Sequence, residues 1–156
     1  MKSSRHRFLP VPVCALLLAA AGCSSGDDAA SVAVPEPPAD QVAVCKALDK
    51  KLPKTVAGHA RSDPSPASEL TAGWGDAAIV LRCGVPRPDK MDDPNAQAVD
   101  ANGVNWMVEQ RKSGPRFTTT YRKAYVEVTM GPEYAHDVTP LSDFANAVKR
   151  TDPSVL

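Results

Sequence analysis

The sequence predicts an α+β domain. We expect an antiparallel sheet of four or five strands, with one helix from each end of the domain packed on the same face and one disulfide. Three observations predict this class. Apolar residues recur at three- and four-residue steps near both ends of the domain, and they alternate with polar residues between about residues 69 and 130. Two cysteines also fall on the apolar faces of a helix and a strand.

The first helix is expected over residues 40–52, with Asp40 as its N-cap and Pro53 just beyond its end. Lysines near its C-terminal end suit the helix dipole. Its expected inward face holds Val42, Cys45, Leu48 and Leu52.

The strands come next along the chain. Residues 53–68 read as a loop with room for a short strand at 55–57, and residues 86–98 read as an exposed loop. Asn102-Gly103 lies between apolar residues and predicts a hairpin turn. The expected strands are 69–74, 78–85, 104–109, 117–120 and 124–130. The central one, 78–85, directs Ile79, Leu81, Cys83 and Val85 to one face and Val80 and Arg82 to the other.

The last helix is expected to begin at Thr139-Pro140, with Thr139 as the N-cap and Pro140 in the first turn. Lys149 and Arg150 suit its C-terminal end. Its expected inward face holds Leu141, Phe144, Ala145 and Val148.

Four cysteines are present, and two of them, Cys14 and Cys23, lie in or at the end of the N-terminal leader. Cys45 and Cys83 remain for the folded domain, and both are predicted on inward faces. We favour a disulfide between them, worth roughly 4 kcal/mol in the chain-entropy model. The alternatives are free thiols or metal ligation with His59.

Residues 1–22 resemble a lipoprotein signal peptide. Lys2, Arg5 and Arg7 precede an apolar stretch, 8–21, that is too short and too proline-broken to span a membrane. The ending Leu18-Ala-Ala-Ala-Gly-Cys23 resembles the lipobox of bacterial lipoproteins. This resemblance implies acylation of Cys23 and anchoring on the outer face of the cytoplasmic membrane. The alternative is an ordinary secretory signal with a chance cysteine.

Residues 23–40 are expected to form a lipidated flexible tether, because they are small, polar and proline-rich. Residues 41–156 then form a single domain. That domain carries 15 basic and 14 acidic residues, so it is nearly neutral and nucleic acid is not an expected partner.

Several runs of residues resemble an uncharacterised actinobacterial family of exported proteins, catalogued as a domain of unknown function. The resemblance covers about residues 42–150 and implies export and a single domain, with no catalytic assignment. It is carried by Ala72-Gly-Trp-Gly-Asp76, Ile79-Val-Leu-Arg-Cys-Gly-Val-Pro-Arg-Pro88, Gly103-Val-Asn-Trp106, Phe117-Thr-Thr119 and Arg122-Lys-Ala-Tyr-Val126.

One set of side chains could clamp a small phosphate or carboxylate ligand, because arginines that converge at a sheet end bind such groups. Its members are Arg82, Arg87, Thr118, Thr119, Arg122 and Tyr125. The alternative, which we favour, is that Arg82 pairs with Glu127 and that Arg122 pairs with an acid such as Asp76.

Other features have simpler interpretations. Trp74 and Trp106 could form a sugar-stacking platform, but we favour core positions for both. The stretch 100–105 is expected to be a hairpin turn rather than a calcium loop, since it lacks the further acids of such a loop.

The sequence nominates no catalytic set. The histidines after the leader, His59 and His136, stand in polar loop-like stretches, and no nucleophile or metal motif accompanies them. We therefore expect a non-catalytic envelope interaction module without cofactor or metal. The alternatives are a binding protein for a small anionic or saccharide ligand and, least favoured, a hydrolase of wall material.

Overall fold

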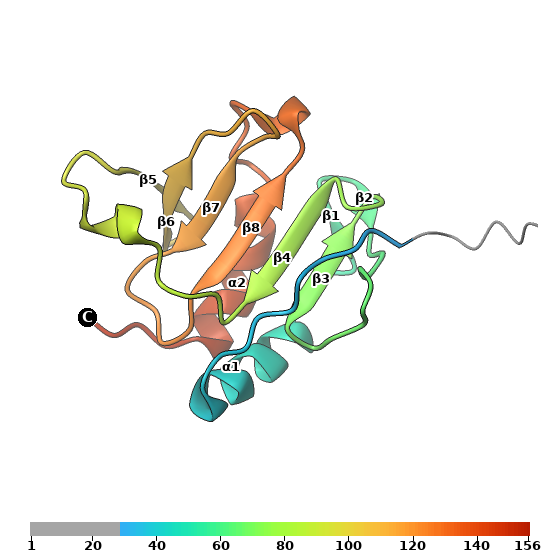
Figure 1. The fold of residues 1–156 in the computed structure, drawn as a ribbon, viewed down its shortest axis with the longest axis horizontal. Helices are drawn as coiled ribbons and strands as arrows, with labels where there is room; N and C mark the ends of the chain where they lie inside the picture. Colours follow the sequence, from blue (N-terminus) through green and yellow to red (C-terminus); the bar gives the residue numbers. More distant parts are fainter. Residues whose placement is uncertain (1–28) are drawn as a thin grey trace, which may run out of the picture.

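Residues 29–156 are described by a computed structural model (Figure 1). A six-stranded antiparallel sheet in the order β3-β4-β8-β7-β6-β5 forms its centre, beside a small two-stranded sheet, β1-β2. The strands are β1 (Thr55–Val56), β2 (His59–Ala60), β3 (Thr71–Trp74), β4 (Ile79–Cys83), β5 (Gln97–Ala101), β6 (Val104–Glu109), β7 (Arg116–Thr119) and β8 (Val126–Met130). The helices are α1 (Ala39–Asp49) and α2 (Leu141–Thr151), with 3-10 turns η1 (Asp89–Asp92) and η2 (Pro132–Tyr134).

The α+β class is confirmed, but the expected strand count is wrong in detail. The main sheet has six strands because β5 begins at Gln97, inside the stretch expected to be a loop. Three of its five residues are exposed, so it lacks a clear apolar alternation. A two-residue strand at His59 also pairs with the short strand expected near Thr55.

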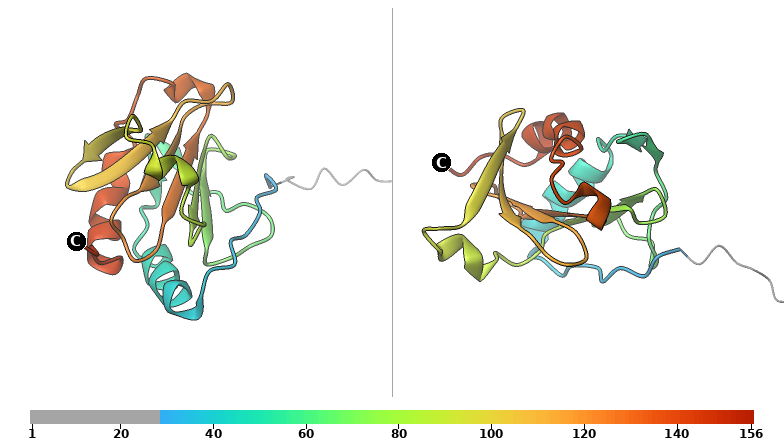
Figure 2. Two further views of the ribbon diagram at one scale, coloured as in Figure 1. Left: turned by 60° about the vertical axis from the view of Figure 1, so that its left-hand side comes forward. Right: turned by 90° about the horizontal axis from the view of Figure 1, so that it is seen from above.

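Both helices lie on one face of the sheet (Figure 2). We call the opposite side the outer face. Trp74 and Phe144 pack edge to face, with 5.2 Å between ring centroids, and join β3 to α2. Trp106 is also fully buried, in the core cluster that includes residues of both helices. The two tryptophans are therefore core residues, and neither can stack on a ligand.

Cys45 of α1 and Cys83 of β4 are joined in the predicted disulfide, with 5.5 Å between their Cα atoms. Both side chains are buried. The bond ties the first helix to the centre of the sheet.

The helix ends differ from the predictions. α1 begins after Pro38, whose carbonyl accepts the N–H groups of Gln41 and Val42, so Asp40 is in the first turn and is not the cap. The helix ends at Asp49 and excludes Leu52, because a residue before proline disfavours the helical region. The predicted cap Thr139 is also wrong, since α2 is preceded by Pro140 without a side-chain cap.

Residues 29–38, which we call the strap, run in extended form across the outer face over β3 and β4 (Figure 2). Val32 donates its N–H to Ser65 O and Ser65 donates to Ala30 O, both at 2.9 Å. Pro35 is buried. Most of the stretch predicted as a tether therefore lies against the sheet or in α1. The remainder of it, the predicted acylation site Cys23 and the predicted signal peptide lie outside the described residues.

Candidate functional site

The predicted ligand-binding residues do not converge on one point. Arg82 on β4 stands opposite Glu127 on β8 in the sheet register, and its Nη1 lies 3.2 Å from Glu127 Oε1. The structural ion pair that we favoured for Arg82 is therefore confirmed.

The same outer face holds a second ion pair. Arg116 donates two hydrogen bonds to the carboxylate of Glu109, at 2.7 and 2.8 Å, and lies 3.7 Å from Glu127. The bonds from Arg116 hold the pKa of Glu109 below its usual value. The arginines on this part of the outer face are thus already paired with carboxylates.

Arg122 lies elsewhere, and both expectations for it are wrong. Its guanidinium donates to the backbone oxygens of Asp152, at 3.0 Å, and Gly103, at 3.4 Å, so it neither joins Arg82 nor pairs with Asp76. The prediction assumed that the strand continues from Arg122 into β8. Instead Tyr121 adopts a left-handed backbone conformation, with φ 55°, and turns the chain between β7 and β8.

Thr118 and Thr119 are neighbours on β7 and so point to opposite faces. Thr119 is buried on the helix side, where its hydroxyl accepts the N–H of Val126 at 2.9 Å. Thr118 faces outward beside Met107 in the register, yet it is also fully buried. Neither threonine is open to a ligand.

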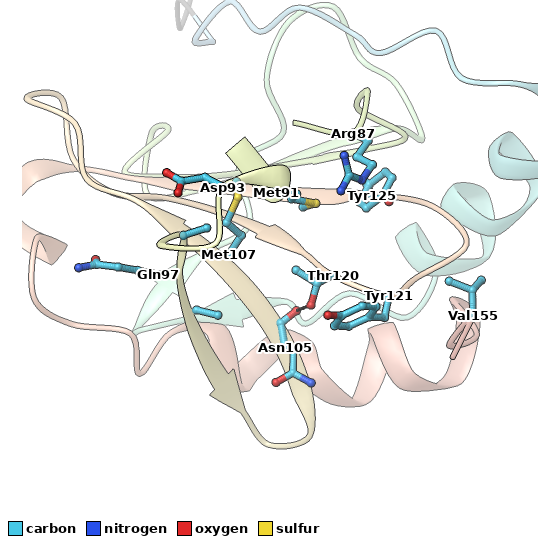
Figure 3. Close-up of a pocket in the computed structure, with 12 residues that line it drawn as sticks. Arg87, Met91, Asp93, Gln97, Asn105, Met107, Thr120, Tyr121, Tyr125 and Val155 are labelled. Atoms are coloured by element: carbon cyan, nitrogen blue, oxygen red, sulfur yellow. Dashed lines mark hydrogen bonds between the residues drawn. The ribbon is translucent and has the colours of Figure 1, made fainter. Parts of the chain in front are cut away.

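The two remaining predicted residues, Arg87 and Tyr125, line a hollow of about 440 Å³ on the outer face (Figure 3). Its floor is formed by the outward side chains of Ala98 on β5 and of Asn105 and Met107 on β6, and by the ends of β7 and β8. The loop that contains η1 forms one wall, and Tyr121 with Val155 forms the other. We call this cavity the hollow.

The charges at the hollow are paired. Arg87 donates two hydrogen bonds to Asp92, at 2.9 and 2.7 Å, which raise the pKa of Arg87 and lower that of Asp92. The N–H of Asn95 donates to Asp93 and lowers the pKa of that carboxyl. Arg87 is the one basic residue in the described lining, so no unpaired cation faces the hollow.

Other polar groups in the hollow are uncommitted. Within residues 29–156, the amide of Asn105 and the hydroxyl of Tyr121 make no side-chain hydrogen bond. The amide of Gln97 points away from the hollow, because Gln97 pairs with the inward-facing Val108 (Figure 3). The side chains of Met91 and Met107 add apolar surface to the lining of the hollow. The cavity can therefore offer donors, acceptors and apolar contacts to an incoming group.

Sequence reasoning missed Tyr121, Met91 and Met107. Tyr121 is 55 % exposed, which is unusual for so large a side chain in this domain. A signal was available for Met107, because it alternates with Trp106 and so falls on the strand face where polar residues were expected. No pattern in the sequence pointed to Met91 or Tyr121.

The histidines do not contribute to the hollow. His59 lies 3.0 Å from the hydroxyl of Tyr134, and His136 is exposed. In the part of the chain that the structure describes, no three His, Cys, Asp or Glu side chains are grouped to hold a metal ion. Likewise, no helix among these residues is long and apolar enough to cross a membrane.

Comparison with known proteins gives one match. A family model described as a protein of unknown function, DUF3515, matches residues 8–155, which is nearly the whole chain. No curated protein and no solved structure matches.

Proposed function

Because the chain belongs to this family of unknown function, we propose from its own geometry that it is a membrane-anchored envelope lipoprotein acting as a non-catalytic binding module. The hollow is its recognition surface. The observation that carries this proposal is the lining of the hollow, which combines two tyrosines and two methionines with the uncommitted amide of Asn105. Such a mixture of apolar surface and a few polar groups is typical of binding pockets.

Export is supported by the disulfide between Cys45 and Cys83, because such bonds persist in oxidising compartments. The basic and apolar leader and the lipobox-like ending at Cys23 support lipid anchoring. Cys23→Ala in the full chain should release the protein from membranes, as measured by fractionation of cells. Unchanged attachment would contradict the anchor.

A small anion is a poor candidate ligand. Arg87 already holds Asp92, and Arg82 and Arg116 hold Glu127 and Glu109. An anion would have to displace a carboxylate before it gained a partner, and that displacement costs the bonds already made.

A partner protein is the second candidate occupant. Tyr121 and Val155 stand at the rim and are 55 % and 63 % exposed. Exposed apolar side chains beside a pocket are typical of protein interaction sites, and tyrosine, methionine and arginine are enriched in them.

Photo-crosslinking on intact cells tests the recognition surface. A photoreactive amino acid replaces Tyr121 in one full-length variant and Asn146 in a control. Asn146 is exposed on α2, on the other side of the sheet. We expect crosslinked products from position 121 alone. No product from position 121, or the same products from both positions, would count against the hollow.

A further inference from the structure

We propose that the hollow binds an uncharged saccharide. This inference rests on the proposed binding function and names the class of ligand that the lining would recognise. It is carried by three properties of the lining: its charge balance, its arrangement of apolar and planar polar side chains, and its exposed aromatic rim.

The charge balance disfavours anionic ligands. The guanidinium of Arg87 is held by both oxygens of Asp92, and Asp93 lies 3.7 Å from Lys90. Asp93 also lines the hollow and would repel an anion. An uncharged ligand can enter without breaking either pair.

The side chains match the two surfaces of a sugar ring. A pyranose or furanose carries C–H groups that pack on apolar and aromatic surfaces, and Met91, Met107 and Tyr125 provide such surfaces. Its hydroxyls act as both donors and acceptors. The amide of Asn105 offers both roles as well, and it makes no side-chain hydrogen bond within the described chain.

Tyr121 extends the aromatic surface to the rim (Figure 3). Its left-handed φ of 55° is unfavourable for a residue with a Cβ, and it is held by the N–H of Val155, which donates to Tyr121 O at 3.0 Å. A strained and exposed aromatic residue next to a cavity indicates a role in binding. The ring of Tyr121 would stack on a sugar unit that extends beyond the rim of the hollow.

A protein segment would use the hollow differently. An apolar anchor residue would need the methionines and Tyr121, but it would leave the amide of Asn105 without a partner. The two ligand classes are therefore distinguished by their dependence on Asn105.

The test is a binding assay on the purified full chain in detergent, by NMR or calorimetry. The probes are uncharged disaccharides (chitobiose, maltose, cellobiose and an arabinofuranose disaccharide), with glucose 6-phosphate and glucuronic acid as charged counterparts. We expect at least one uncharged sugar to bind. Asn105→Ala and Tyr121→Ala should each weaken it about fivefold to tenfold, the effect of one lost polar or stacking contact.

Asn146→Ala is the matched control, because it removes the same amide from an exposed site on α2. It should leave binding unchanged. No uncharged sugar binding, or sugar binding that is insensitive to Asn105→Ala and Tyr121→Ala, would overturn the saccharide inference. If position 121 still crosslinks to a protein on cells, the binding function stands with a different ligand. If it crosslinks to nothing, both proposals fail.

Discussion

At the scale of single residues, Tyr121 shows how a residue proposed to bind a ligand can lower the stability of the fold. Its φ of 55° is a conformation that glycine adopts freely and other residues adopt at a cost. Tyr121→Gly should therefore be more stable than Tyr121→Ala by about 1 kcal/mol, although both lose the ring. Chemical denaturation checks this difference.

The control for Tyr121 is Ala43, which is exposed within α1. There Ala43→Gly should lower the free energy of unfolding by about 0.5–1 kcal/mol, because a helix favours alanine. If glycine were no better than alanine at position 121, the strain assigned to this turn would be absent. The backbone conformation of Tyr121 would then give no support to a role in binding.

Asp152 is a second residue with a measurable consequence, because burial raises the pKa of its carboxyl to about 6. The N–H of Ala124 donates to its Oδ1 at 3.0 Å and opposes that shift only in part. An unfolded aspartate titrates near 3.9. Between pH 4 and 6 the folded state therefore holds a proton that the unfolded chain has lost. The free energy of unfolding should fall as pH rises through this window.

Asp152→Asn tests this dependence, because the amide oxygen can still accept the Ala124 bond but carries no charge. The stability of the variant relative to the natural chain should increase from pH 4 to pH 6. We expect the change to reach about 2 kcal/mol, a value reduced for solvent screening. Asp137→Asn is the control, because hydrogen bonds from Thr139 lower the pKa of Asp137. Its stability relative to the natural chain should stay level from pH 4 to pH 6 and should rise only as the pH falls below about 4. A flat difference for Asp152→Asn would contradict the raised pKa.

At the scale of elements, the strap depends on one glycine at the end of β4. Gly84 has φ 83°, and a Cβ there would overlap the ring of Pro37 in the strap. Gly58 has the same φ, but a Cβ added there would have no atom within 4 Å, so Gly58 is a matched control. Gly84→Ala should cost about 1–3 kcal/mol more than Gly58→Ala, since it adds overpacking to the same backbone strain.

Hydrogen exchange at Val32 separates a local effect from a global one, because the N–H of Val32 bonds to Ser65 in the folded chain. Faster exchange there in Gly84→Ala, with little change in the core strands, would show that the strap detaches. Equal effects of the two glycine substitutions would mean that Pro37 does not press on β4.

The elements also show how far the sequence was informative. Alternation located β4, β6 and β8, and the paired cysteines connected α1 to β4 correctly. The edge strand β5 was missed in part because its exposed residues give no apolar period. Helix ends were misplaced because prolines, rather than polar caps, precede both helices.

The candidate site was harder to predict than the fold. Arg87 and Tyr125 were nominated for anion binding, but they meet in a cavity that also needs Met91, Tyr121 and Val155. These residues come from a loop, a turn and the C-terminal segment, and their contact depends on tertiary packing. Side-chain pairing such as that of Arg87 with Asp92 changed the expected ligand chemistry, and sequence spacing alone does not determine such pairs.

At the scale of the whole molecule, the strap and the hollow occupy opposite edges of the sheet. The strap begins beside the loop that precedes β3, where Ala29 and Asp63 line one surface depression. The hollow lies over β5 and β6. Five inter-strand steps separate β3 from β5 in the sheet order, which corresponds to roughly 24 Å.

This separation predicts how an anchored domain would stand on a membrane. Only residues 24–28 lie between Cys23 and the strap, a chain length of at most roughly 20 Å. The strap itself is held against the sheet, so the edge at β3 should remain near the bilayer and the hollow should lie farther from it. The recognition surface would then be open to envelope components.

Energy transfer on vesicles measures this orientation. Donor dyes are attached to Asp63→Cys or Gln97→Cys in the full lipidated chain, and the acceptor is a lipid headgroup. Asp63→Cys should transfer more efficiently than Gln97→Cys, because the β3 edge is nearer to the membrane. The same chains with Cys23→Ala should show no transfer, since they lack the anchor. Equal transfer from both positions would indicate a freely tumbling domain, and stronger transfer from Gln97→Cys would place the hollow against the membrane.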